Sequence, residues 1–168
     1  MFNIQTPYFL NYSEATSFQK SGELIEFIKS AKSSLDVAIF DITLNKVAQE
    51  IIAQSKKIPV RVLVDRRQSQ GPHSAVAALI KNGVKVRFGH QSGGVMHNKF
   101  TIVDGLMVET GSFNYTAGAA HKNNENQVYL FTPNVVDRYR ARFEKIWNLG
   151  DEPAGAEPSP SPSVSPLP

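Results

Sequence analysis

The sequence contains no cysteine, which excludes disulfide bonds and metal sites built on thiolates. It also has no apolar run approaching the ~20 residues that are needed to span a bilayer. The first residues, 1–7, have neither the basic nor the apolar segment of a secretory signal. We therefore expect a soluble protein without a transmembrane segment. The compartment stays open, because the chain is either cytoplasmic as written or an exported domain from which a signal peptide has been removed.

Apolar residues are scarce in the last eighteen positions, 151–168, which hold six of the ten prolines. Four serines alternate with them between positions 159 and 165. Such a segment cannot bury enough apolar surface to fold. We predict a disordered, Pro/Ser-rich tail over 151–168 that follows one globular domain over residues 1–150, a length that suits a single hydrophobic core.

Negative charge is the minority sign, with 15 Asp and Glu against 18 Lys and Arg. Three of the acidic residues, Asp151, Glu152 and Glu157, lie in the predicted tail, so the domain has a net charge of 18 minus 12, or +6. A positive surface attracts polyanions such as nucleic acid or anionic lipid headgroups. The charge alone favours such a partner only modestly.

Short apolar runs typical of buried strands alternate with segments whose apolar residues recur at helical spacing, a rhythm that predicts an α/β domain. The expected strands cover residues 35–40, 60–64, 84–88, 100–103, 106–110 and 127–131. The expected helices cover residues 22–30, 45–57, 74–82 and 133–149. The dipeptide Asp104-Gly105 between two of the strands is a strong hairpin signal.

Two candidates for chemistry, His97 and Lys99, stand at the start of the first hairpin strand. Alternation along an extended chain places them on the same face. A neutral imidazole is a nucleophile toward phosphorus, and a nearby ammonium neutralises phosphate charge. This pair therefore favours attack on a phosphate ester, with His97 as the nucleophile.

Further polar residues follow the second hairpin strand, whose end should lie beside the start of the first. Gly111 permits close approach of the backbone, and Ser112 and Asn114 supply neutral hydrogen bonds for phosphate oxygens. Glu125 is suited to accept a hydrogen bond from the ring of His97 and so to fix its tautomer. Together these groups predict a phosphate site with an oriented nucleophile.

The spacing His-x-Lys, four residues, Asp, six residues and Gly-Ser-x-Asn resembles the signature of the phospholipase D superfamily. This sequence carries it as His97, Lys99, Asp104, Gly111, Ser112 and Asn114. The resemblance is closest to small bacterial endonucleases with a single copy of the motif, and it covers residues 6–147.

The resemblance implies a three-layer α/β/α sandwich around a mixed, mostly parallel β-sheet. It also implies a homodimer in which two motifs meet at one shared active site, a covalent phosphohistidine intermediate, and no metal or other cofactor. The implied substrate is nucleic acid, DNA before RNA, cleaved with little sequence preference. Two other functions share the signature. A lipid phosphodiesterase should present an apolar acyl-binding surface, which we do not find in the sequence, and a catalytically silent nucleic-acid-binding module should lack a catalytic residue.

Some positions admit two interpretations. Asp104 belongs to the motif, yet Asp-Gly is also ordinary turn chemistry, and we favour a structural role for it. Arg66 and Arg67 follow the carboxyl end of a strand, where α/β sheets usually bind ligands. They either contact phosphates of nucleic acid or lie in a solvated loop. Three further histidines are left out of the catalytic set: His73, His90 and His121.

Overall fold

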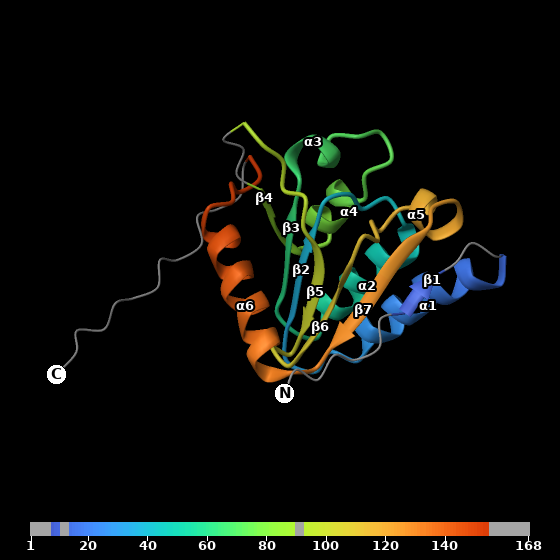
Figure 1. Ribbon diagram of the computed structural model, residues 1–168. Coiled ribbons are helices and arrows are strands. Elements are labelled where there is room, and N and C mark those ends of the chain that lie inside the picture. Colours follow the sequence, from blue (N-terminus) through green and yellow to red (C-terminus); the bar gives the residue numbers. More distant parts are fainter. Residues whose placement is uncertain (1–7, 11–13, 90–92, 155–168) are drawn as a thin grey trace.

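A computed structural model describes residues 8–10, 14–89 and 93–154. Within these residues, seven strands form one sheet in the order β1-β7-β6-β5-β2-β3-β4 (Figure 1). The strands are β1 (Tyr8–Leu10), β2 (Leu35–Ile39), β3 (Val60–Val64), β4 (Lys85–Phe88), β5 (Lys99–Val103), β6 (Met107–Gly111) and β7 (Glu125–Leu130).

The sheet is mixed, as predicted. Strands β2, β3 and β4 pair in parallel through helical crossovers, whereas the other four pairings are antiparallel. Only β5 and β7 run against the other five strands, so the sheet is mostly parallel in strand direction although most neighbouring pairs are antiparallel. Most neighbouring pairs are antiparallel because β5 lies antiparallel beside β2 and then turns back through a tight hairpin into β6.

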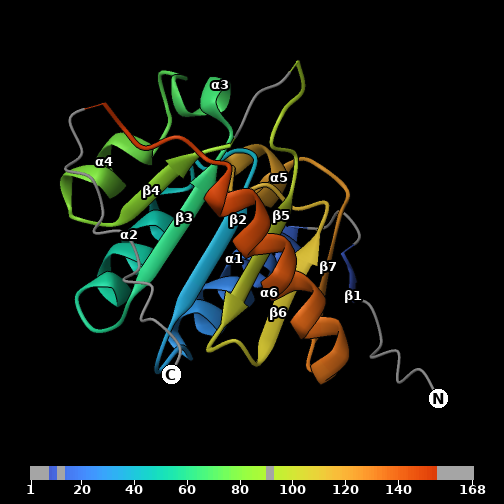
Figure 2. The same ribbon diagram turned by 90° about the vertical axis from the view of Figure 1, so that its left-hand side faces the viewer.

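Helices cover both faces of the sheet, which confirms the predicted three-layer sandwich (Figures 1 and 2). Four helices pack on one face: α1 (Glu14–Lys29), α2 (Asn45–Ser55), α4 (Val76–Lys81) and α5 (Ala117–His121). The long helix α6 (Pro133–Asn148) covers the other face. The strands at the centre are apolar on both sides because both sides are covered, and every residue of β5 is buried.

The two faces have separate cores. On one, Leu24 and Ile28 of α1 and Ile51 of α2 pack on the sheet. On the other, Phe143 and Trp147 of α6 stack on each other with ring centroids 5.7 Å apart and cover the sheet from the opposite side. The apolar residues of α6 lie on one face of the helix because that face packs on the sheet.

The structure contains every helix and strand that the apolar pattern predicts, but α1 begins eight residues before the expected position 22. Its first two turns contain only two apolar residues, Ala15 and Phe18, and so give little periodic signal. Three short elements were not predicted: β1, α3 (Arg66–Ser69) and α5. Helix α3 is a single turn that Asp65 caps through the backbone N–H groups of residues 67 and 68.

The packing of the domain continues past the predicted boundary at residue 150. Asp151 exchanges two backbone hydrogen bonds with Phe88, of 2.8 and 2.9 Å, and its carboxylate lies 2.5 Å from Arg66. Glu152 forms an ion pair of 2.7 Å with Arg87. The first residues of the segment expected to be a tail therefore bind the edge strand β4, and residues 155–168 lie outside the described part of the chain.

Apart from Asp104, the motif residues lie near strand ends along one side of the sheet. The carboxyl ends of β2, β3 and β6 and the amino ends of β5 and β7 all meet at this edge, the upper one in Figure 1. We call it the motif edge. No helix within the described residues is both long enough and apolar enough to cross a membrane.

Candidate active site

His97 and Lys99 lie together at the motif edge. Lys99 is the first residue of β5 and pairs in register with Ile39 at the end of β2. Its Nζ lies 3.4 Å from Nε2 of His97 and donates a hydrogen bond of 3.1 Å to the His97 carbonyl. The lysine is buried and the histidine is exposed. The pair therefore presents an accessible imidazole with a fixed cation beside it.

The ring of Phe40 contacts both residues of this pair, and the sequence did not predict this contact. Its ring centroid lies 4.6 Å from the His97 ring and 5.0 Å from the Lys99 ammonium. Burial lowers the pKa of Lys99, and the negative charge of Glu125 partly opposes this shift. The described contacts of the desolvated ammonium, with the His97 carbonyl, His97 Nε2 and the Phe40 ring, include no anion, so an anionic ligand would complete its environment. The sequence did hold one signal for this contact, because Phe40 directly follows the strand that pairs with Lys99.

Gly111 allows the next strand to approach closely. A Cβ at this position would stand 2.0 Å from the carbonyl oxygen of Asn126, which is a direct clash with the backbone. The close approach lets Ser112 N donate to the Asn126 carbonyl and lets Asn126 N donate to Ser112 Oγ, both over 3.1 Å. The hydroxyl of Ser112 is thereby held at the motif edge.

Glu125 binds Ser112 rather than His97. One carboxylate oxygen accepts a short hydrogen bond from Ser112 Oγ, and the other accepts one of 3.0 Å from Asn123. Within the described residues no hydrogen bond joins Glu125 to His97. The sheet order explains this difference from the expected pairing, because Glu125 begins β7, the neighbour of β6, whereas His97 leads into β5, one strand further away.

Asn114 carries an amide with an open hydrogen-bonding capacity. Its Oδ1 is buried and has no partner among the described residues. The next residue, Tyr115, fixes the backbone here, since its N–H donates to Asp41 over 3.0 Å and its carbonyl accepts from Thr43 and Leu44. Oδ1 is an acceptor, as the oxygens of a phosphate are, so a phosphate cannot be its partner. The group of Asn114 that can bind a phosphate oxygen is the amide Nδ2, which donates.

A buried polar network lies under Asn114 and was also missed from the sequence. The hydroxyl of Tyr115 contacts Thr101 over 2.5 Å and donates to Glu109 over 2.9 Å, while Gln127 Nε2 donates to Glu109 over 3.0 Å. Burial raises the pKa of Glu109 to about 7, although the hydrogen bonds from Gln127 and Tyr115 act in the opposite direction. This network ties β5, β6 and β7 together directly below the site.

Asp104 lies at the opposite end of β5 from Lys99, far from the reacting groups. Its carboxylate accepts hydrogen bonds of 2.7–3.0 Å from the backbone N–H groups of Lys32, Ser33 and Ser34 and from the Ser33 hydroxyl. Burial raises the pKa of Asp104, but these hydrogen bonds outweigh it and leave the pKa below its usual value. The residue joins the β5–β6 turn to the loop after α1.

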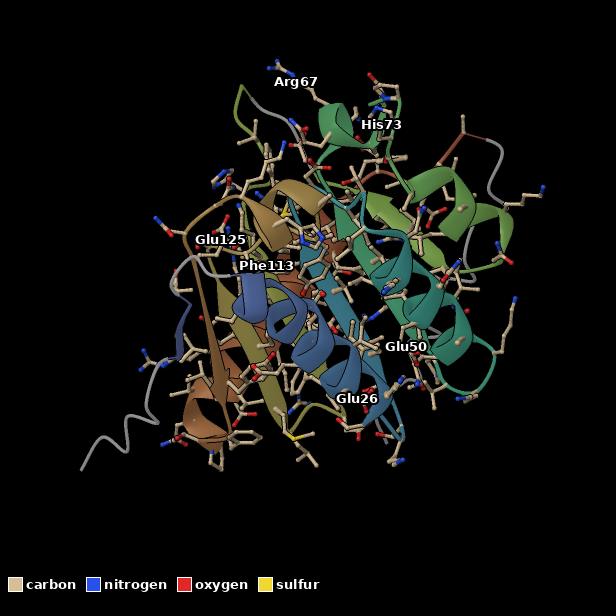
Figure 3. All side chains as sticks on the ribbon, turned by 90° about the vertical axis from the view of Figure 1, so that its right-hand side faces the viewer. Glu26, Glu50, Arg67, His73, Phe113 and Glu125 are labelled. Atoms are coloured by element: carbon tan, nitrogen blue, oxygen red, sulfur yellow. The ribbon has the colours of Figure 1, made fainter. Side chains whose placement is uncertain are left out.

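The two arginines of α3 differ. Arg66 is engaged within the domain, paired with Asp151 and stacked over the Phe88 ring at 4.9 Å. Arg67 is exposed, and its guanidinium projects from the motif edge without a hydrogen bond to any described residue (Figure 3). His73 and His121 are exposed, whereas His90 lies outside the described residues.

Taken together, the motif edge holds an exposed imidazole, a buried ammonium, a positioned hydroxyl and an amide with open capacity. This set suits a tetrahedral oxyanion such as a phosphate. The imidazole is the nucleophile, the ammonium and the Asn114 amide nitrogen are donors, and the Ser112 hydroxyl becomes a third donor when its hydrogen turns from Glu125 to the ligand. Within the described residues, no group of three or more His, Asp or Glu side chains lies close enough together to hold a metal ion.

Comparison with known proteins identifies the family. Residues 24–147 match the family described as cardiolipin synthase, PLD-like domain. The chain therefore belongs to the phospholipase D superfamily.

Individual relatives agree with this assignment. The mitochondrial cardiolipin hydrolase of Danio rerio is 34% identical over 137 residues, which are 81% of this chain and 59% of that protein. That of Homo sapiens is 31% identical over 125 residues, which are 74% of this chain and 49% of that protein. The chain thus spans only about half to three fifths of the length of these relatives.

Two solved structures have the same fold. Nuc from Salmonella typhimurium, a phospholipase D family member, superposes with a TM-score of 0.73 at 28% identity, covering 79% of this chain and 90% of that one. NucT from Helicobacter pylori superposes with a TM-score of 0.79 at 22% identity, covering 88% and 97%.

Proposed function

We propose that this domain is an endonuclease that hydrolyses the phosphodiester bonds of DNA, and of RNA, with little sequence preference and without a metal. The observation that carries the proposal is the contact between His97 and Lys99 at an exposed edge of the sheet, 3.4 Å from Nε2 to Nζ. An imidazole nucleophile and a fixed ammonium are what a metal-independent attack on phosphorus requires. The net positive charge of the chain supports a polyanionic substrate.

In the first step, a ring nitrogen of His97 forms a bond to phosphorus while the bond from phosphorus to the leaving oxygen breaks. Lys99 Nζ and the Asn114 amide nitrogen donate to the phosphate oxygens and stabilise the charge that builds up on them, and Ser112 joins them by turning its hydroxyl hydrogen from Glu125 to the phosphate. The leaving oxygen needs a proton, and one chain offers no second histidine of the motif.

A homodimer supplies that proton. When two copies meet at their motif edges, the protonated His97 of the partner subunit donates to the leaving oxygen. In the second step the same imidazole, now neutral, takes a proton from water, whose oxygen bonds to phosphorus as the phosphorus–nitrogen bond breaks. The enzyme returns to its starting protonation state.

The role of Glu125 in this proposal is to position Ser112 and to keep Lys99 charged. Its carboxylate binds the Ser112 hydroxyl, and its charge opposes the lowering of the Lys99 pKa by burial. Glu125→Gln should therefore preserve the hydrogen bond with Ser112 but lower the pH at which Lys99 loses its proton. The variant should lose activity at alkaline pH before wild type does.

The central experiment traps the intermediate. Wild-type enzyme quenched during turnover of a radiolabelled oligonucleotide in excess EDTA should carry label on His97, in a bond that is labile to acid and stable to base. Label on Ser112, or complete loss of cleavage in EDTA with rescue by magnesium, would reject the mechanism.

The shared site has a separate test. If wild-type and His97→Ala chains are reassembled at random, activity should fall as the square of the wild-type fraction, to about one quarter at equal mixing. Independent subunits would retain about one half, which would refute a shared site.

A second candidate substrate is a phospholipid, because the curated relatives include proteins named mitochondrial cardiolipin hydrolase. Side-by-side assays on single-stranded DNA, duplex DNA, RNA and cardiolipin vesicles distinguish the two candidates. Cleavage of the vesicles alone would replace the nuclease proposal, and binding of nucleic acid without cleavage of any substrate would indicate a catalytically silent module.

A further inference from the structure

Helix α6 carries a stripe of basic side chains on the face that points away from the sheet. The stripe consists of Arg138, Arg142 and Lys145, which follow one another at spacings of four and three residues and are all exposed. Such spacings place neighbouring side chains about 5–6 Å apart on one side of a helix. The opposite side of α6 is buried against the sheet through Val136 and Phe143.

The charge of this stripe is not neutralised within the described residues. Both acidic side chains of α6 have other partners, since Asp137 pairs with Arg140 at 3.1 Å and Glu144 pairs with Arg61 at 2.6 Å. None of the three stripe residues takes part in an ion pair that the structure describes. The outer face of α6 therefore presents three uncompensated positive charges in a row.

We infer that this stripe is a second contact surface for the substrate, which binds phosphates of the nucleic-acid backbone remote from the bond that is cut. The inference rests on the proposed nuclease function. A regular row of flexible cations suits a polymer with regularly spaced phosphates, which releases counterions when the charges meet. A bilayer fits less well, because an interfacial helix inserts a large apolar face and the apolar face of α6 is used in the core.

The position of α6 connects the stripe with the site. The helix crosses the full height of the sheet, and its carboxyl end lies at the motif edge, where residues 150 and 151 meet the end of β4 (Figure 2). Lys145 is thus the stripe residue nearest to the motif edge and Arg138 the most distant. A substrate that reaches the stripe must extend beyond the nucleotides held at His97, so the stripe should select for length.

The test compares two triple variants with the same change in net charge. In one, Arg138, Arg142 and Lys145 become glutamine. In the control, Lys32, Lys57 and Lys81 become glutamine. These lysines are also exposed, but Lys32 and Lys57 follow α1 and α2 and Lys81 ends α4, the helices on the other face of the sheet. Each protein is assayed on a 30-base-pair duplex and on bis(p-nitrophenyl) phosphate, across a series of salt concentrations.

The α6 variant should cleave the small ester as wild type does, but its KM for the duplex should rise about tenfold at 0.1 M salt, with a log–log salt dependence shallower by about 2–3. The control variant should change the duplex KM by much less. Equal changes in both variants would reduce the effect to net charge and overturn the inference, as would an unchanged salt dependence in the α6 variant. If the α6 variant lost only its binding to cardiolipin vesicles, the surface would be a membrane contact and the inference would be wrong. If wild type cleaved the ester but no nucleic acid, the proposed function itself would fail.

Discussion

The two ends of strand β5 both carry motif residues, and they differ in how completely their polar groups are satisfied. At the turn, the Asp104 carboxylate accepts hydrogen bonds from three backbone N–H groups and a hydroxyl. At the motif edge, burial lowers the pKa of Lys99, and the described contacts of its ammonium, with His97 and the Phe40 ring, include no anion. At the turn, the chain itself supplies the hydrogen-bond partners of the carboxylate. At the motif edge, a cation remains that a ligand of opposite charge could bind.

This contrast separates two reasons for which a polar residue occupies a fixed place in a motif. A charge whose hydrogen bonds are all supplied by the protein contributes to folding. A charge held in a partly desolvated, under-bonded state contributes to binding of a ligand of opposite sign. Substitutions at the two ends should therefore affect different measurements, and the following predictions rank them by size.

The largest effect is expected at the motif edge. His97→Ala should lower the rate of turnover on the order of 10⁴-fold or more, and Lys99→Ala about 10²–10³-fold. Both variants should melt within a few degrees of wild type, because neither residue completes a structural network. Thermal unfolding by circular dichroism, measured alongside the rate, checks this pair of results, and a large loss of stability in His97→Ala would contradict the contrast.

The complementary effect is expected at the turn. Asp104→Asn keeps a residue that tolerates the positive φ of 55° but removes the charge, so it should cost about 1–3 kcal/mol of unfolding free energy. Since the folded pKa of Asp104 is lowered, its contribution is present above the ordinary value of 3.8 and is lost as pH falls through the folded pKa. The gap between wild type and variant should close in strong acid. Activity per folded molecule should remain near that of wild type, and a stable but inactive variant would refute the structural role.

Glu109 belongs to the buried network below the site, between the two ends of β5. Its substitution tests whether protonation of Glu109 changes the stability of the domain. Its folded pKa of about 7 lies above the ordinary 4.5, so wild type loses stability as pH rises through this range. Glu109→Gln removes that loss, and its amide can donate to the Gln127 Oε1 that has no partner. The stability difference between variant and wild type should shift in favour of the variant on the order of 3 kcal/mol from pH 4 to pH 8, by urea unfolding. A difference that does not change with pH would show that Glu109 does not titrate in this range.

The smallest effects concern the two arginines of α3. Arg67→Gln should raise the KM for nucleic acid about two- to threefold at low salt and leave stability unchanged, because its guanidinium has no hydrogen-bond partner among the residues that the structure describes. Arg66→Gln should lower the melting temperature by about 2–4 °C, because it breaks the contacts with Asp151 and Phe88. Reversal of these two outcomes would reassign the roles of the arginines.

The three layers were implied by the family resemblance. The sequence pattern predicted the alternating helices and strands, the hairpin and the meeting of His97 with Lys99, because these depend on periodicity and on residues close together in the chain. It did not predict Phe40 under the imidazole or Glu109 under Tyr115, because both contacts depend on strand register. It placed Glu125 against His97, whereas the strand order places it against Ser112. Short motifs therefore define the groups that react, and the sheet defines what surrounds them.

The hydrogen bonds of Asp104 also bear on the order in which the domain assembles. Lys99 begins the β5–β6 hairpin, and His97, Ser112 and Asn114 lie directly before or after it. The two strands can pair through contacts that are local in the chain. The carboxylate in its turn reaches residues 70–72 positions earlier, so the hairpin can dock only after the chain has closed a much longer loop. Local contacts can thus bring the reacting groups together early. The hairpin becomes a rigid binding site only when α1 and β2 have folded against it.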